Sequence, residues 1–365
     1  MRVVIAPDSF GGTLGPVEAA AAIAAGWRRV RPDDALDLIP MSDGGEGLLD
    51  ALLAGPMADA VVNVEDVADA TGLAVAARWL MTADGTAVIE SAEACGLSRI
   101  AEARRDPRRA TSWGVGQLLD AARKAGATRI LVGLGGTATL DGGAGALSGL
   151  GFRLTVADGS GLKIGGEDLP RVHAVAPTWV ADWSGVTVQL LVDVAEPLAA
   201  APARYGPQKG ADAAGIAHAE AGLAAWRAAA EAHLGAAPTL ADQPGTGAAG
   251  GLGFGLIAGL GAVLRSGARA VGSAVGLDDA LARADLVISG EGRLDATSDA
   301  GKVLGWVHGR ADAAMVATAA VVGQLAPGVG TAGRMIEVSA PDGPGDDPAA
   351  EVAAAARRLA TQVDG

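Results

Sequence analysis

Short apolar segments alternate with segments of helical periodicity near both ends of the chain. Buried strands are predicted at residues 3–6, 36–39, 285–289 and 315–322. Helices are predicted at 16–30, from the end of the loop at 43–47 to residue 53, and at 349–363. Pro16 suits a first helical turn, and Glu18 interacts favourably with the positive N-terminal end of that helix. Such strand–loop–helix alternation predicts a doubly wound parallel sheet built from both chain ends.

The pattern changes after about residue 60. Shorter strands are predicted at 61–64, 74–80, 86–91, 130–134 and 188–192, with helices at 111–125 and 216–234. Asp and Gly turns separate the first three of these strands, which is typical of an antiparallel or mixed sheet. We therefore predict an α/β protein of two domains. Residues 1–60 and 265–365 form a discontinuous, Rossmann-like doubly wound domain, interrupted by a mixed α/β domain at 61–264.

Composition and charge narrow the class of protein. Half of the 365 residues are apolar, so a large core can be buried, and the net charge is −14. That charge argues against a general nucleic-acid or anionic-membrane partner. Cys95 is the only cysteine, so no disulfide can form within the chain, which fits a reducing cytoplasm. A strand pattern from residue 2 onward leaves no room for a signal peptide, and we expect a cytoplasmic protein.

One segment is rich in arginine. It contains Arg99, Arg104, Arg105, Arg108 and Arg109, with Glu102 and Asp106 between them. Because opposite charges are interspersed, we interpret the segment as a solvated surface rather than a binding patch.

The motif Asp-Gly-Gly-x-Gly occurs twice, at residues 43–47 and 141–145. Each copy follows an apolar run and precedes an Ala/Leu-rich helical stretch. Glycines at such a junction let backbone N–H groups approach an anion, and the adjacent carboxylate can hold a metal ion that bridges phosphate oxygens. The alternative is a pair of tight turns, each with an Asp helix cap.

Other carboxylates and cations also follow predicted strands. The acids are Asp8, Asp43, Glu46, Asp141, Asp193, Glu291 and Asp295, and the cations are Lys209, Arg293 and Lys302. Ligands of open α/β sheets lie outside the carboxyl ends of the strands. Acids that hold magnesium or accept a proton, together with cations that neutralise a moving phosphoryl group, suit metal-assisted phosphoryl transfer.

Competing motifs fail their context tests. Residues 245–250 match G-x-G-x-x-G, but no strand precedes them, which disfavours a nicotinamide-dependent dehydrogenase. There is no P-loop and no G-x-S-x-G elbow. The four histidines lack the spacing of zinc ligands.

Six motifs occur together in a fixed order. They are A-P-D-S-F at 6–10, P-M-S-D-G-G-E-G at 40–47, G-L-G-G-T-A at 133–138, G-P-Q-K-G-A at 206–211, G-A-A-G-G-L-G at 247–253 and G-E-G-R-L-D at 290–295. From residue 3 to about 325 the chain resembles the bacterial glycerate kinases of the two-domain α/β type. The resemblance implies phosphorylation of D-glycerate by ATP with Mg²⁺, at the 2- or 3-position, in a cleft between the domains. A homodimer is compatible with it.

The resemblance and the strand-end pattern give one set of candidate residues. The catalytic candidates are Asp193, Asp43, Arg293 and Lys209, and the metal ligands are Asp193 and Asp141. The substrate- and phosphate-binding candidates are Asp8, Ser9, Gly44, Gly45, Glu46, Gly135, Gly136, Thr137, Gln208, Glu291, Asp295 and Lys302.

The chain departs from the family pattern at four positions: Gly11, Leu140, Glu196 and Thr297 replace polar residues or a lysine of the pattern. These changes leave two alternatives open. One is a catalytically weak or inactive nucleotide- or hydroxy-acid-binding homologue. The other is a kinase for a related small hydroxy acid.

Overall fold

The chain divides into two compact units. Residues 1–59 and 266–365 form the terminal unit, and residues 60–265 form the central unit. The computed structural model describes residues 1–295, 302–329, 335–340 and 343–363. Each unit is described by itself.

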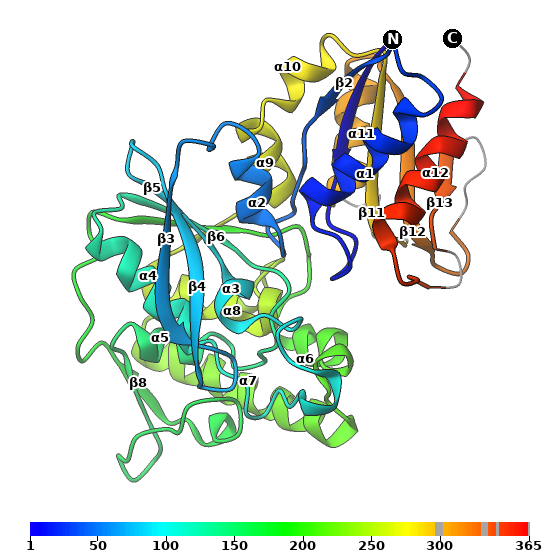
Figure 1. Ribbon diagram of the computed structural model, residues 1–365. Helices are drawn as coiled ribbons and strands as arrows, with labels where there is room; N and C mark the ends of the chain where they lie inside the picture. The colour runs from blue at the N-terminus through cyan, green and yellow to red at the C-terminus, as the bar shows by residue number, and fades with distance from the viewer. Residues whose placement is uncertain (296–301, 330–334, 341–342, 364–365) are drawn as a thin grey trace. The chain divides into compact units, whose positions relative to one another are not determined.

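The terminal unit is a parallel sheet with strand order β13-β12-β11-β1-β2 (Figure 1). Its strands are β1 (Arg2–Pro7), β2 (Ala35–Leu38), β11 (Leu286–Leu294), β12 (Ala317–Leu325) and β13 (Met335–Val338). Its helices are α1 (Pro16–Arg28), α2 (Leu48–Leu53), α9 (Gly267–Ala274), α10 (Leu277–Leu281), α11 (Val303–Ala313) and α12 (Pro348–Gln362). The chain runs outward from β1 in one direction and from β11 in the other. The strand order therefore reverses between β1 and β11.

Apolar residues of successive strands form the core of this unit. Val3, Ile5, Leu286 and Ile288 pack with the Ala-rich faces of α1 and α12. Helix α11 packs against β11 and β12. The doubly wound parallel sheet predicted from both chain ends is confirmed.

One predicted loop is wrong. Residues 290–294 were expected to leave the sheet after residue 289, but β11 continues to Leu294. The reason is that β12 also extends and pairs with it, with Glu291 opposite Val322 and Arg293 opposite Gln324. Thus Glu291 and Arg293 lie on a paired strand, whereas Thr297 lies outside the described residues.

The central unit contains a mixed sheet with order β10-β9-β6-β5-β4-β3 and a separate pair, β7-β8. The strands are β3 (Val61–Ala68), β4 (Ala74–Met81), β5 (Thr86–Glu90), β6 (Arg129–Gly133), β7 (Arg153–Thr155), β8 (Ala174–Ala176), β9 (Thr187–Leu191) and β10 (Val263–Arg265). The helices are α3 (Ser91–Cys95), α4 (Trp113–Lys124), α5 (Ala144–Gly149), α6 (Ala201–Tyr205), α7 (Ala213–His233) and α8 (Ala248–Leu260). The β3–β4 and β4–β5 pairs are antiparallel and the remaining pairs of the large sheet are parallel. The inserted mixed α/β fold is confirmed.

Close helix packing in the terminal unit depends on Gly26. A Cβ atom there would lie 2.0 Å from the carbonyl oxygen of Ala353 in α12. We expect Gly26→Ala to lower the free energy of unfolding by about 1–3 kcal/mol, because the two helices must move apart. Gly309 in α11 is a matched control, since a Cβ there meets no atom within 4 Å. Gly309→Ala should raise stability by about 0.5–1 kcal/mol through helix propensity. Urea denaturation measures both, and equal effects would contradict the packing argument.

Candidate active site

The loop after β2 carries the first Asp-Gly-Gly motif. The Gly44 N–H donates to the Ser42 hydroxyl at 3.1 Å, and the Gly45 N–H donates to Oδ1 of Asp43 at 2.9 Å. These bonds hold the turn that starts α2. Burial raises the pKa of Asp43. The hydrogen bond from the Gly45 N–H and the nearby charge of Lys302 oppose this rise. The second oxygen, Oδ2, is not used by the turn bond from Gly45.

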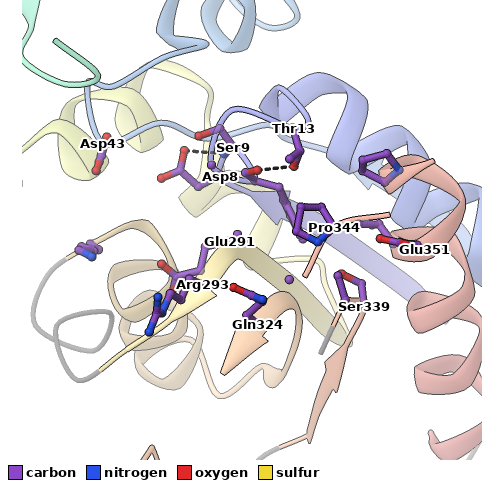
Figure 2. A pocket seen from close by; sticks show the side chains of 18 residues that line it. Asp8, Ser9, Thr13, Asp43, Glu291, Arg293, Gln324, Ser339, Pro344 and Glu351 are labelled. Atoms are coloured by element: carbon purple, nitrogen blue, oxygen red, sulfur yellow. Dashed lines mark hydrogen bonds between the residues drawn. The ribbon is translucent and has the colours of Figure 1, made fainter. Parts of the chain in front are cut away.

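A pocket of about 340 Å³ lies in the terminal unit, where the strand order reverses (Figure 2). Six predicted site residues line it: Asp8, Ser9, Asp43, Glu291, Arg293 and Lys302. They come from the end of β1, the loop after β2, the extension of β11, and the residue before α11. The geometry therefore brings together residues that are up to about 290 positions apart in the chain.

Local hydrogen bonds and an ion pair position Asp8 and Asp295 near this pocket. The Asp8 N–H donates to the Gly290 carbonyl at 2.9 Å, which continues the β1–β11 ladder by one residue. The Ser9 N–H then donates to Oδ1 of Asp8 at 2.7 Å. Lys302 Nζ lies 3.8 Å from Oδ1 of Asp295. Asp295 itself is not among the lining residues.

Sequence reasoning missed several polar residues of this pocket. Thr13, Gln324, Ser339 and Glu351 also line it. Gln324 lies two residues beyond the strand predicted at 315–322, and the register that places it opposite Arg293 exists only in the folded sheet. Glu351 lies in the first turn of α12, where an acid is ordinarily explained by the helix dipole.

The second Asp-Gly-Gly loop, in the central unit, has a different structure. Asp141 is fully buried and accepts hydrogen bonds from the Ser112 N–H and hydroxyl and from the Gly143 and Gly145 N–H groups. Burial raises its pKa, and these bonds oppose the rise. A metal ion would have to displace donors that now hold the loop to α4. This arrangement matches the alternative of a structural cap.

The remaining predicted residues of the central unit lie after neighbouring parallel strands. Gly135, Gly136 and Thr137 follow β6, and Asp193 follows β9, whose Leu191 pairs with Gly133. At the same register, Glu90 ends β5 opposite Gly133 and is 5 % exposed. Glu90 was missed by the sequence analysis, and the signal for it was an acid directly after the apolar run 87–89. Because carboxyl ends of parallel strands share one edge, Glu90, the 135–137 loop and Asp193 lie along the same edge of this sheet.

Lys209 joins two of the sequence motifs. Its ammonium group donates to the Thr139 carbonyl at 2.7 Å and to the Thr137 hydroxyl at 3.3 Å. The side chain is 3 % exposed and its Nζ lies 5.8 Å from the centre of the Tyr205 ring. Gly250 packs so closely on the same Thr139 carbonyl that a Cβ there would lie 1.9 Å from the oxygen. Lys209 thus fixes the loop that contains Gly135, Gly136 and Thr137, and Gln208 precedes it in the same short helical turn.

Burial lowers the pKa of Lys209 to about 8, although Cys95 and Asp141 oppose this shift. The unfolded chain should titrate near the ordinary lysine value of about 10.4. Between these values the unfolded state binds more protons, so the contribution of Lys209 to stability rises as pH increases from about 8 to about 10. We expect the unfolding free energy of the wild type, relative to Lys209→Met, to rise over that range. Lys163→Met, at an exposed position, is the control and should show no such trend in urea denaturation.

The described lining of the pocket of the terminal unit contains carboxylates and no His or Cys. Among the residues that the structure describes, no group of three or more His, Cys, Asp or Glu side chains is arranged to hold a metal ion. Magnesium commonly binds through one or two carboxylates together with substrate phosphates. Asp8, Asp43 and Glu291 supply carboxylates around the pocket of the terminal unit. No helix within the described parts of the chain is long and apolar enough to cross a membrane.

Comparisons with known proteins place these observations in a family. The model of the glycerate kinase family matches residues 3–361. The chain is 39 % identical over 317 residues to "Glycerate 2-kinase" of Escherichia coli K12, covering 83 % of this chain and 80 % of that protein. It is also 39 % identical to "Glycerate kinase" of Bacillus subtilis, covering 83 % and 79 % of the two chains.

A solved structure agrees across the whole length. It is a protein of Salmonella typhimurium LT2 with the provisional name glycerate kinase 2, and it matches with a TM-score of 0.79 and 34 % identity. The match covers 99 % of this chain and 98 % of that one. With the ordered motifs, the doubly wound terminal unit and a family match over nearly all residues, the chain belongs to the glycerate kinase family, whose members are enzymes.

Proposed function

We propose that this protein transfers the terminal phosphoryl group of ATP to a hydroxyl group of D-glycerate. Membership in a kinase family implies the use of ATP. The observation that carries the choice of substrate is the family match over residues 3–361, together with relatives named for glycerate. The acid- and cation-lined pocket of the terminal unit supports it, because glycerate offers one carboxylate and two hydroxyl groups for such side chains.

We assign roles by the chemistry of each side chain. Arg293 binds an anionic oxygen of the substrate or of the phosphoryl group, since guanidinium binds such groups bidentately. Asp43 and Asp193 accept the substrate hydroxyl proton or hold Mg²⁺. Asp8, Ser9, Glu46, Gly44, Gly45, Glu291, Asp295 and Lys302 complete the binding groups of the terminal unit. When bound, Mg²⁺ would neutralise phosphate charge.

In the central unit, Lys209 acts by holding the 135–139 loop in the conformation that presents its backbone groups. Gly135, Gly136, Thr137 and Gln208 would then contact phosphate or substrate. Asp193 is our preferred metal ligand in this unit, because the oxygens of Asp141 already accept four donors. The shared cleft between the domains remains a prediction.

We further propose that the 2-hydroxyl group is the acceptor. The support is the name of the Escherichia coli relative, "Glycerate 2-kinase", at 39 % identity. Incubation of the purified protein with ATP, Mg²⁺ and D-glycerate, followed by ³¹P and ¹H NMR of the product, distinguishes 2- from 3-phosphoglycerate. Formation of 3-phosphoglycerate would overturn the position while preserving the kinase.

The four departures from the family pattern bear on the alternative of an inactive homologue. Leu140 is buried, and Glu196 accepts a hydrogen bond from the Tyr205 hydroxyl at 3.0 Å and pairs with Arg204 at 3.2 Å. Both are therefore integrated into the central unit. Gly11 lines the terminal pocket in a left-handed conformation, φ 53°. A panel of small hydroxy acids tests the alternatives: turnover on another acid favours a related kinase, and nucleotide binding without any turnover favours an inactive homologue.

A further inference from the structure

The arginine-rich segment surrounds a cavity of the central unit. The cavity has a volume of about 710 Å³. Four of the five arginines of the segment line it: Arg99, Arg104, Arg105 and Arg109. Arg108 does not, and its guanidinium lies 3.6 Å from Asp212. The mixed charge of the segment suggested a solvated surface, but the structure shows that the segment also forms a wall of this cavity.

These arginines differ in whether their side chains have partners within the protein. Arg99 pairs with Glu93 at 3.0 Å, and Arg105 donates to the carbonyls of Ile100 and Gln208. The side chains of Arg104 and Arg109 make no hydrogen bond or ion pair with any other residue that the structure describes. Two guanidinium groups therefore remain available at the cavity.

The acids of the cavity wall do not neutralise these two groups. Asp69 accepts through Oδ1 from the Thr71 N–H, the Thr71 hydroxyl and the Leu73 N–H, and so serves its own turn. Asp106 accepts from the Arg108 N–H at 3.1 Å. Glu167, the third acid of the lining, forms no ion pair with Arg104 or Arg109. The lining therefore presents two guanidinium groups that none of its acids pairs with. An anion is the ligand that such a lining favours.

Apolar side chains complete the wall. Leu73 and Ile164 line the cavity and are 63 % and 54 % exposed. Ile100, which lies between Arg99 and Arg104 in the sequence, also lines it. A volume near 700 Å³ is in the range of small-molecule sites. The combination suits a ligand with an anionic group and an apolar or planar part.

We propose that this cavity binds a phosphate-bearing small molecule, with Arg104 and Arg109 as its principal phosphate ligands. Guanidinium groups match phosphate oxygens bidentately, and the apolar wall accommodates the remainder of the molecule. Two kinds of molecule carry such a phosphate group: the nucleotide used as phosphoryl donor, and a separate phosphorylated metabolite.

The cavity is connected to the motif loop that carries Lys209. Arg105 Nη1 donates to the Gln208 carbonyl at 3.2 Å. On the other side, a Cβ at Gly210 would lie 2.6 Å from the Arg105 carbonyl oxygen, so the two segments are in close backbone contact. Arg105 therefore links the wall of the cavity to the loop at 206–210 by direct contact.

Calorimetric titration of the intact protein with inorganic pyrophosphate and with ADP tests the proposal. The variants are Arg104→Gln and Arg109→Gln, with Arg108→Gln as the control that removes the same charge outside the cavity. We expect each of the first two to weaken a pyrophosphate-binding component by roughly tenfold or more, the loss of one charge-assisted phosphate contact. Arg108→Gln should stay within about twofold of the wild type. Unfolding midpoints should be unchanged, because neither guanidinium has a partner to lose among the described residues.

Kinase assays on the same variants identify the source of the phosphate. A raised KM for ATP with unchanged kcat identifies the nucleotide donor as the occupant, whereas an unchanged KM identifies a separate ligand. Wild-type affinity in both cavity variants, an equal loss in Arg108→Gln, or no wild-type binding of either probe would overturn the proposal. Because binding is measured without glycerate, this outcome is independent of whether glycerate is the substrate.

Discussion

Replacement of Asp193 by Asn should lower turnover about 100-fold or more while the protein remains folded. Asp193 follows β9 at the edge where the 135–137 loop also emerges. Asn keeps the size of the side chain but removes the negative charge. That charge is required to accept the proton of the substrate hydroxyl or to bind a magnesium ion. Positioned acid–base groups typically contribute factors of about 10²–10⁴. The measurement is kcat with ATP and D-glycerate, together with the thermal midpoint.

Asp43→Asn is the companion variant in the terminal unit. Its carboxylate lines the pocket and its Oδ1 accepts from Gly45, a bond that the Asn oxygen can preserve. A comparable loss is expected. Asp59→Asn is the control, because Asp59 is exposed and has no role in either loop. Near-normal turnover in both Asp193→Asn and Asp43→Asn would remove them from the site.

The second large effect is expected for Arg293→Lys. A structural role for Arg293 would be an ion pair with Glu291 or Asp295, which lysine could largely preserve. No ion pair joins Arg293 to any residue of the described chain, and its side chain is exposed on the pocket. Arginine binds phosphate or carboxylate through a planar pair of N–H groups, and a lysine ammonium cannot reproduce that geometry. Turnover should therefore fall about 10²-fold, less than the roughly 10³–10⁵ that an arginine contributes to phosphoryl transfer, because the lysine retains the positive charge.

The readout must separate chemistry from folding. The melting temperature of Arg293→Lys should match that of the wild type, because no internal ion pair is lost. Arg310→Lys, on the exposed face of α11 and paired with Asp278 at 2.8 Å, is a control for a general arginine-to-lysine effect. Wild-type kinetics in Arg293→Lys, or a loss accounted for entirely by unfolding, would assign Arg293 a structural role only.

Local patterns in the sequence sufficed for most of the elements. Continuous apolar runs such as residues 3–6 are typical of strands buried on both faces, and β1 covers them. Helical periodicity identified α1, α4, α7 and α12 to within a few residues. These features depend on neighbours in sequence, so they can be predicted without knowledge of the fold.

Errors arose where distant segments decide the outcome. The glycines of residues 290–292 indicated a loop, yet pairing with β12 extends β11 through them. The two Asp-Gly-Gly motifs are alike in sequence, but Ser112 and the start of α4 enclose Asp141, whereas Asp43 borders a pocket. The sequence of the arginine segment indicated a solvated surface. In the folded protein, residues of 69–73 and Ile164 line a cavity together with it.

The sequence alone determined the order of strands and helices, the candidate acids at strand ends and the family resemblance. These follow from local hydrophobic spacing, from turn chemistry and from the order of short motifs. Only the tertiary structure decided which candidates share a pocket and which carboxylate is enclosed by hydrogen bonds. It also added Gln324 and Ser339 to the pocket of the terminal unit and Glu90 to the sheet edge of the central unit. The physical reason is that strand register and helix packing bring together side chains hundreds of residues apart, and burial then determines which charges remain available for a ligand.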